Sequence, residues 1–478
     1  MNWSHLRKCF ITAIATLSVF AVTLTSSAYS ESSNEVMRDF DISSEVFIVG
    51  VSLYVLGFAV GPALWGPLIR TLRKTASLGR LSCSHGGLHR RFCRKSKHHY
   101  TPRTTISCGH LWRITSCNSG GAIADLFSPA QRGLAMVIYC VAPFLGPVVG
   151  PVMGGFISEN VGWRWVQGVC CILVGIIGIL GSIFFRNICQ YWPGMIGIVG
   201  AIFIPETYGP VLLMRRAKHL SKADGKIYIS VLEKSQGKKK PSEVFKRALV
   251  RPWVLLFLEP IVFVASTYMA IIYGTVYLFM GAMPVVYNQD RHWSEGIGGL
   301  AFLGIAVGFL LEVVYSIYDN DRRYMKLFLS QKATAEARLP PAIVGAIALP
   351  VGMFAFAWTN YRSIHWSVGI ILTAPFGAGC VLVIMPLINY LIDSYTIYAA
   401  SVLAAAAIFR AIVGAAFPLF TNRLYKAIGI HWASSIPAFL TLLCMPFPLI
   451  MHRYGEALRM KCKYSFEAAE MMKRMQSK

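Results

Sequence analysis

The chain has 478 residues, of which 55% are hydrophobic and only 14% are charged, and its formal net charge is +24. Soluble proteins carry about a quarter charged residues, so this composition excludes an ordinary water-soluble domain. Several stretches contain the roughly 20 apolar residues that cross a bilayer, and we therefore expect an all-α polytopic membrane protein.

Apolar runs and polar connections alternate along the whole chain. Runs long enough to span lie at 10–29, 44–68, 134–157, 164–185, 252–283, 297–318, 341–358, 368–392, 395–420 and 432–451. From this order we expect an N-terminal helical half over 1–204, a central cytoplasmic loop over 205–251, a C-terminal six-helix half over 252–451 and a cytoplasmic tail over 452–478.

Lys and Arg residues concentrate in the connections and predict the orientation. Eleven of them lie between Ile69 and Arg113, and no Asp or Glu occurs from Val46 to Ala124. Basic residues beside spans are typical of cytoplasmic loops, so they do not indicate nucleic-acid binding. We expect a multi-pass protein of the lipid bilayer, in the plasma membrane, with both termini in the cytoplasm.

The stretch 69–119 is rich in Cys and His, which are zinc ligands. These residues are Cys83, His85, His89, Cys93, His98, His99, Cys108, His110 and Cys117. The Cys83-x-His85 and Cys108-x-His110 spacings are tighter than those of zinc sites. We therefore expect no metal, and a basic loop that lies on anionic lipid, with a zinc site as the alternative.

Six of the ten residues from Gly146 to Gly155 are Gly or Pro. In a water-exposed helix each would cost about 1 kcal/mol (Gly) or about 3 kcal/mol (Pro), but a membrane helix tolerates them. Gly146, Gly150 and Gly154 recur every four residues and form a smooth stripe for close helix packing. The run predicts a helix that packs, bends and slides in a moving bundle, as in a transporter.

A near-repeat lies in and after the run 164–185. Residues 175–184 recur at 194–203 with seven identities in ten. Two spans here would place the basic loop 205–251 outside the cell, against the charge pattern. We therefore expect one copy to cross the membrane and the other to lie along the interface.

Ionisable residues inside spans are functional candidates, because they are costly there. Asp393 is the first candidate, since it closes the run 368–392 beside Asn389 and Tyr390. If desolvated, a carboxylate can bind and release a proton near neutral pH and so couple it to a substrate. The alternative is that Asp393 caps a helix at the interface. Arg410 is predicted to be its partner or a packing charge on the cytoplasmic gate.

Three further groups have competing interpretations. Glu259, directly before Pro260, is predicted either to attract a cationic substrate or to lie near the lipid headgroups. Glu312, towards a helix end, is expected to snorkel to the surface. Tyr268, Tyr273 and Tyr277 line a cavity for flat or cationic molecules, or simply pack between helices. No phosphate loop, catalytic triad or metal pair occurs, so we expect neither an enzyme nor a cofactor.

Several motifs resemble the twelve-span drug:proton antiporters of the major facilitator superfamily, in the fungal branch with multidrug and polyamine exporters. The matching segments are 124–133, 146–157, 159–165, 205–210 with 215–218, and 389–395 with 398–401. The resemblance covers roughly 1–68 and 119–460.

The resemblance implies a fold of two helical halves that rock around a cavity built from the first, fourth, seventh and tenth helices. It implies a monomer that exports small organic molecules (drugs, toxins, secondary metabolites or polyamines) in exchange for protons. It also implies that one set of residues forms the antiporter motif: Gly146, Pro147, Gly150, Pro151, Gly154 and Gly155.

The resemblance stops between about Ile69 and Ser119, where the third helix and most of the fourth are missing. The stretch that replaces these helices begins and ends abruptly, contains no Asp or Glu, and is close to them in length. Translation in a wrong reading frame would produce such a replacement. The alternative prediction is therefore a transport-inactive, degenerate copy, or an error in the gene prediction, of such a transporter.

Overall fold

The computed structural model is helical throughout its regular elements, which confirms the predicted fold class. It describes residues 5–72, 129–186, 220–221, 228, 241–330, 334–396 and 398–476. Within these residues seven helical segments are long and apolar enough to cross a membrane. The Cys/His-rich stretch 69–119 beyond Leu72, the repeat copy at 194–203 and most of the central loop lie outside the described residues.

The N-terminal helices follow the predicted apolar runs. They are α1 (His5–Ala28), η1 (Ser30–Ser32), α2 (Ser33–Phe40), α3 (Ser44–Leu72), α6 (Pro129–Val161) and α7 (Trp163–Arg186). The first copy of the near-repeat, 175–184, lies inside α7.

The C-terminal helices contain two breaks, of which the apolar runs predicted only the second. Pro260 begins a new helix after Glu259, so the run 252–283 is divided between two helices. Gly429 has φ +76°, a conformation that glycine adopts readily, and it breaks the longest helix between the runs 395–420 and 432–451.

These helices are α11 (Pro241–Leu258), α12 (Pro260–Met283), η2 (Pro284–Asp290), α13 (Glu295–Gly299), η3 (Leu300–Phe302), α14 (Leu303–Asp319), η4 (Asn320–Tyr324), α15 (Met325–Leu329), η5 (Ala335–Arg338), α16 (Pro340–Thr359), α17 (Trp366–Leu372), α18 (Ala374–Ser394), α19 (Ala399–Cys444), α20 (Pro446–Lys461) and α21 (Lys463–Gln476).

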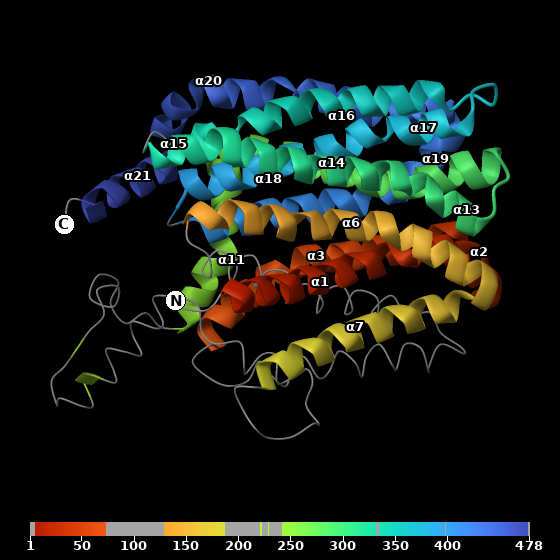
Figure 1. The fold of residues 1–478 in the computed structure, drawn as a ribbon, viewed down its shortest axis with the longest axis horizontal. Coiled ribbons are helices and arrows are strands. Elements are labelled where there is room, and N and C mark those ends of the chain that lie inside the picture. The colour runs from red at the N-terminus through yellow and green to blue at the C-terminus, as the bar shows by residue number, and fades with distance from the viewer. Residues whose placement is uncertain are drawn as a thin grey trace.

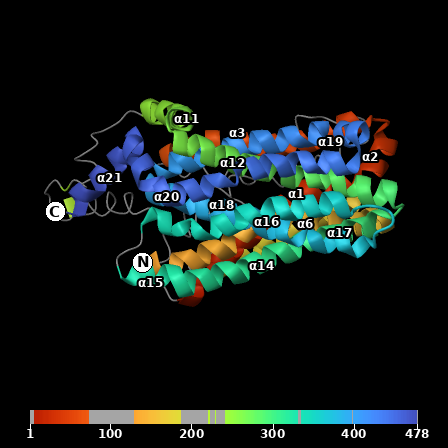
Figure 2. The same ribbon diagram turned by 90° about the horizontal axis from the view of Figure 1, so that it is seen from above.

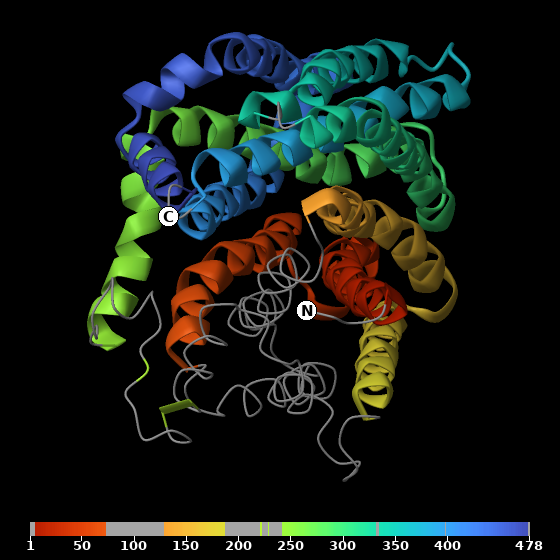
Figure 3. The same ribbon diagram turned by 60° about the vertical axis from the view of Figure 1, so that its left-hand side comes forward.

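The helices lie side by side in two groups (Figures 1 and 2). Figure 3 shows the N-terminal group (α1, α3, α6 and α7) beneath the C-terminal group (α12 to α20). The groups meet where α3 packs against α19 and where α6 packs against α13 and α14. The Phe144 and Phe309 rings, 6.0 Å apart, belong to the α6–α14 contact.

The two ends of the bundle differ in what they contain. α1 begins and α21 ends at the left in Figure 1, and we call this the proximal end. α2, α13 and the turn between α6 and α7 lie at the opposite, distal end. Because successive spans alternate in direction, Asp393 and Glu259 lie at the proximal end and Glu295 at the distal end.

Candidate functional site

Tyrosines of α12 meet side chains of α19 and α1 near the middle of α12. The Arg410 guanidinium carbon lies 5.1 Å from the centre of the Tyr273 ring. The Tyr273 and Tyr277 rings are 5.1 Å apart, and their hydroxyl oxygens are 3.4 Å apart. The Tyr277 hydroxyl is 3.5 Å from the Ser26 hydroxyl of α1. We call Ser26, Tyr273, Tyr277 and Arg410 the central cluster.

A glycine explains how α19 comes so close to α12. A Cβ atom at Gly414 would lie 2.8 Å from Cδ1 of Tyr273. Any larger residue there would push the helices apart and move Arg410, one turn earlier, away from the ring. The cluster offers ring faces, hydroxyl groups and one positive charge, which suits molecules that carry rings and hydrogen-bond acceptors.

Asp393 lies at the proximal end of α18 and is paired with Arg338, not with the expected partner Arg410. The distance from Arg338 Nε to Asp393 Oδ2 is 3.1 Å, and 35% of the Asp393 side chain is exposed. The Arg338 guanidinium also lies 3.9 Å from the centre of the Tyr324 ring. Asn389 is half-buried in α18, and Tyr390 is fully buried.

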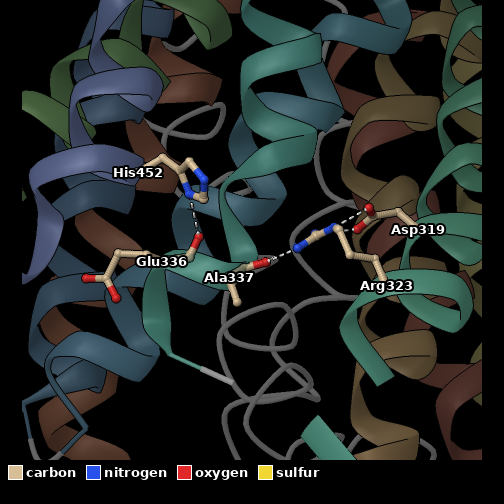
Figure 4. A network of polar contacts seen from close by, with 5 residues as sticks. All are labelled: Asp319, Arg323, Glu336, Ala337 and His452. Carbon is tan, nitrogen blue, oxygen red and sulfur yellow. Dashed lines mark hydrogen bonds and ion pairs between the residues drawn. The ribbon is translucent and has the colours of Figure 1, made fainter. Parts of the chain in front are cut away.

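The short turn η5 contacts several helices at the proximal end, and Figure 4 shows its contacts with Arg323 and His452. Arg323 forms a bidentate pair with Asp319 and donates to the Ala337 carbonyl oxygen at 2.6 Å. Glu336 accepts two hydrogen bonds from Arg459 and contacts His452 through its carbonyl oxygen. With the Arg338–Asp393 pair, η5 thus fixes the ends of α14, α18 and α20 relative to one another.

Glu259 is part of a second proximal contact. It is 1% exposed, and its carboxylate accepts hydrogen bonds from the Tyr395 hydroxyl at 2.8 Å and the Tyr464 N–H at 3.0 Å. Burial, with Glu259 next to it, raises the pKa of Tyr395 far above its usual value, so the phenol remains a donor. This placement favours a structural role for Glu259 over the attraction of a cationic substrate.

The prediction that Glu312 snorkels is wrong. Its side chain is completely buried in α14, a helix that packs against α6 and α18. Ser316 donates to one carboxylate oxygen at 2.6 Å, and the other has no hydrogen-bond partner among the described residues. An incompletely satisfied carboxylate in a membrane helix is costly to keep ionised, so Glu312 is a candidate proton-binding group.

The small-residue stripe of α6 packs against α1. A Cβ atom at Gly146 would lie 2.7 Å from the Leu24 nitrogen, and a Cβ atom at Gly150 would lie 2.8 Å from the Leu24 carbonyl oxygen. Gly154 faces Ala28 in the same way. Gly155 faces the other side, where its Cβ would lie 2.5 Å from the Glu295 carbonyl oxygen of α13. The stripe therefore allows close packing within the N-terminal group and contact with the C-terminal group. Pro147 and Pro151 lie inside the same helix.

The structure brings Tyr273 and Arg410 together, but separates both from Asp393 and Glu259. Sequence reasoning missed Ser26, Arg338 and Glu336. The concentration of hydroxyl residues at 23 and 25–27, towards the end of the apolar run 10–29, was an available signal for Ser26. No local pattern distinguishes Arg338 from other basic residues of the connection 319–340.

Comparisons with known proteins agree on one family. Residues 9–418 match the Major Facilitator Superfamily. The "Major facilitator-type transporter sorT" of Penicillium rubens is 66% identical, over all of this chain and 88% of its own length. The "MFS-type efflux pump MFS2" of Trichophyton rubrum is 48% identical, over 99% of this chain and 77% of its own. In fold, the chain is similar to the xylose transporter XylE from E. coli, with a TM-score of 0.59 and 17% identity over 93% of this chain and 97% of that one.

Proposed function

Because this chain belongs to the Major Facilitator Superfamily, whose members move small molecules across membranes, we propose that it is a proton-coupled exporter of small organic molecules. It works as a monomer in the plasma membrane, without nucleic acid or cofactor. An efflux pump among its relatives supports the direction of transport.

The central cluster is the observation that carries this proposal. It lies where α1 of the N-terminal group meets α12 and α19 of the C-terminal group, which is where a molecule passing between the groups makes contact with both. The Tyr273 and Tyr277 rings supply an aromatic surface, and Arg410 supplies a positive charge. This charge disfavours polyamines and favours neutral or acidic aromatic substrates.

The distribution of charge supports the orientation. At the proximal end Arg322, Arg323, Lys326 and Arg338 lie close together in the chain, and Arg459, Lys461 and Lys463 follow in the tail. Basic residues favour the cytoplasmic side. We therefore place the proximal end in the cytoplasm and the distal end outside the cell.

Buried Glu312 suits the coupling proton better than Asp393. A coupling carboxylate has to be neutral in one state and ionised in another, which requires burial without a fixed cation. Glu312 meets this condition, whereas Asp393 is held by Arg338. In this proposal Asp393 belongs to the proximal contact that fixes helix ends within the C-terminal group.

Expression in yeast cells that lack their own drug exporters tests the function. Cells loaded with the neutral aromatic dye Nile red should lose it faster when they make the protein, and faster still in acidic medium. Arg410→Ala should slow this efflux by about tenfold, equivalent to about 1.4 kcal/mol of lost stabilisation. If the protein reaches the plasma membrane and neither dye efflux nor drug tolerance changes, the transport-inactive alternative is correct.

A further inference from the structure

Four glutamates from separate parts of the chain meet at the distal end. Glu31 lies in η1, Glu35 in α2, Glu159 near the end of α6 and Glu295 at the start of α13. The charges of Glu35 and Glu159 act on Glu295, and the charge of Glu295 acts on Glu31. We call these four residues the distal cluster. Figure 1 shows α2 and α13 at this end of the bundle.

Hydrogen bonds join the N-terminal and C-terminal groups here and end on carboxylates of the distal cluster. Asn34 donates its side-chain N–H to Glu295 Oε1 at 2.9 Å. The Gly296 N–H donates to Glu159 Oε2 at 3.0 Å. The distal cluster therefore lies within the contact that closes this end.

Glu31 is the most deeply buried member of the distal cluster. Only 3% of its surface is exposed, and its Oε1 has no hydrogen-bond partner among the described residues. An ionised carboxylate is costly to bury without a cation or donors, and the nearby charge of Glu295 adds repulsion. Binding one proton reduces both costs.

The charged groups around this pair are already engaged. Arg38 and Arg164 act on Asp39, and Arg164 lies 3.1 Å from it. Arg291 donates to the carbonyl oxygens of residues 361 and 364. The charged or titratable groups on the elements packed around the pair are Glu35, Arg38 and Asp39 on α2, Glu159 on α6, Arg164 on α7, Tyr287 and Asp290 on η2, and Arg291 and His292 before α13; Asp290 is paired with Arg362.

We infer that Glu31 and Glu295 form a proton-binding site that holds the distal end closed while one proton is bound. This inference rests on the proposed function, which makes the distal end the outer face. The site takes its proton from the external medium and returns it there, so this proton differs from the coupling proton of Glu312. It makes opening of the outer face sensitive to external pH.

The sign of the pH effect follows from the burial of the pair. Opening the distal end exposes both carboxylates to water, where each is ionised at neutral pH. The closed state therefore binds the proton more tightly than the open state, and external acid favours closure. As external pH rises through the range in which the closed pair loses its proton, the ratio of closed to open protein falls by at most about tenfold per pH unit for one proton.

Thiol labelling of intact yeast cells without substrate tests this inference. A Ser26→Cys variant reports opening, because Ser26 is 3% exposed in the closed structure. Cells are treated with a membrane-impermeant maleimide in acidic or mildly alkaline medium, and the peptide holding position 26 is quantified by mass spectrometry. A Ser44→Cys variant, at an exposed position at the start of α3, corrects for the pH dependence of thiol reactivity.

The corrected labelling at position 26 should rise several-fold from acidic to alkaline medium. Adding Glu31→Gln, which keeps position 31 neutral, should hold it low at both pH values. Glu295→Gln leaves Glu31 buried but removes the repulsion from Glu295, so it should move the rise to lower pH and increase labelling at intermediate pH. Asp41→Asn, which neutralises an exposed carboxylate in the same connection, should leave the rise intact.

A full rise in the Glu31→Gln protein would overturn the inference. Labelling at position 44 shows whether the Glu31→Gln protein reaches the surface. If it does not, Glu295→Gln decides in its place, and a rise that stays at its original pH in that variant would overturn the inference. Because the assay needs no substrate, its outcome is independent of whether the dye is exported.

Discussion

Glu312 and Asp393 show that the surroundings of a carboxylate, more than its place in a motif, decide what it can do. Both lie on neighbouring helices, α14 and α18, that pack against each other. Glu312 is buried with one oxygen unpaired among the described residues, whereas Asp393 is held by Arg338 and partly exposed. The first environment favours proton binding, and the second favours a fixed contact within the C-terminal group.

Substituting the two carboxylates separately should have different effects on proton coupling and on the rate of efflux. Glu312→Gln should abolish the acceleration of dye efflux by external acid, because the side chain no longer exchanges a proton. Asp393→Asn should slow efflux several-fold but keep its dependence on pH. The measurement is initial Nile red efflux over a range of external pH, normalised to surface protein. Equal loss of pH dependence in both variants would contradict the assignment.

Thiol chemistry checks the Glu259 contact at the proximal end. Burial, with the Glu259 charge second, raises the pKa of the Cys462 thiol to about 11. Since only the thiolate reacts, Cys462 should resist iodoacetamide in mildly alkaline solution, and its reactivity should appear only as the pH rises towards that value. Exposed Cys9 serves as the reference. Glu259→Gln should lower the pKa of Cys462 and advance its reaction to lower pH, and an unchanged rate profile would contradict the contact.

At the scale of elements, the close contact of α6 with α1 is the feature on which the N-terminal group depends. Hydrophobic burial contributes little between membrane helices, so close van der Waals packing of small residues takes its place. Thr23 adds a hydrogen bond from its hydroxyl to the Ala142 carbonyl oxygen across this contact. The Gly and Pro residues of α6 thus allow the helices to approach, while the polar residues of α1 fix their register.

Adding one methyl group to the stripe should be costly. Gly150→Ala places a Cβ 2.8 Å from the Leu24 carbonyl oxygen and 2.9 Å from the Ala28 nitrogen, so backbone must move. We expect destabilisation of about 1–3 kcal/mol, measured as a lower thermal midpoint of the purified protein. Gly175→Ala in α7 is the matched control, because its Cβ would meet nothing within 4 Å. If both substitutions have the same effect, the packing account is wrong.

The elements were predictable from sequence to the extent that a membrane fixes them. Apolar length predicted α1, α3, α6 and α14, since about 20 residues are needed to cross a bilayer. The break after Glu259 was not predicted, because the residues before and after it are apolar and a hydropathy pattern does not show where a helix changes direction. Likewise, the Arg338–Asp393 pair joins residues 55 positions apart, and nothing in the local sequence of either residue specifies the other.

At the scale of the whole molecule, the proposed transport cycle depends on contacts at the distal end, in the middle and at the proximal end. The distal cluster joins the groups at one end, the central cluster joins them in the middle, and the η5 and Glu259 contacts organise the C-terminal group at the proximal end. A transporter that exposes its centre to one side at a time needs contacts at its ends that open alternately. The described helices supply such contacts at the distal end.

Simultaneous measurement of dye and proton movement in proteoliposomes tests the central claim most directly. Purified protein is reconstituted into vesicles that contain a fluorescent pH indicator. A gradient of Nile red, the dye used in the yeast assay, is then applied with no initial pH difference across the membrane. Dye moving down its gradient should drive protons in the opposite direction, and Glu312→Gln should abolish the proton signal. Dye movement through the unsubstituted protein without proton movement would contradict the account.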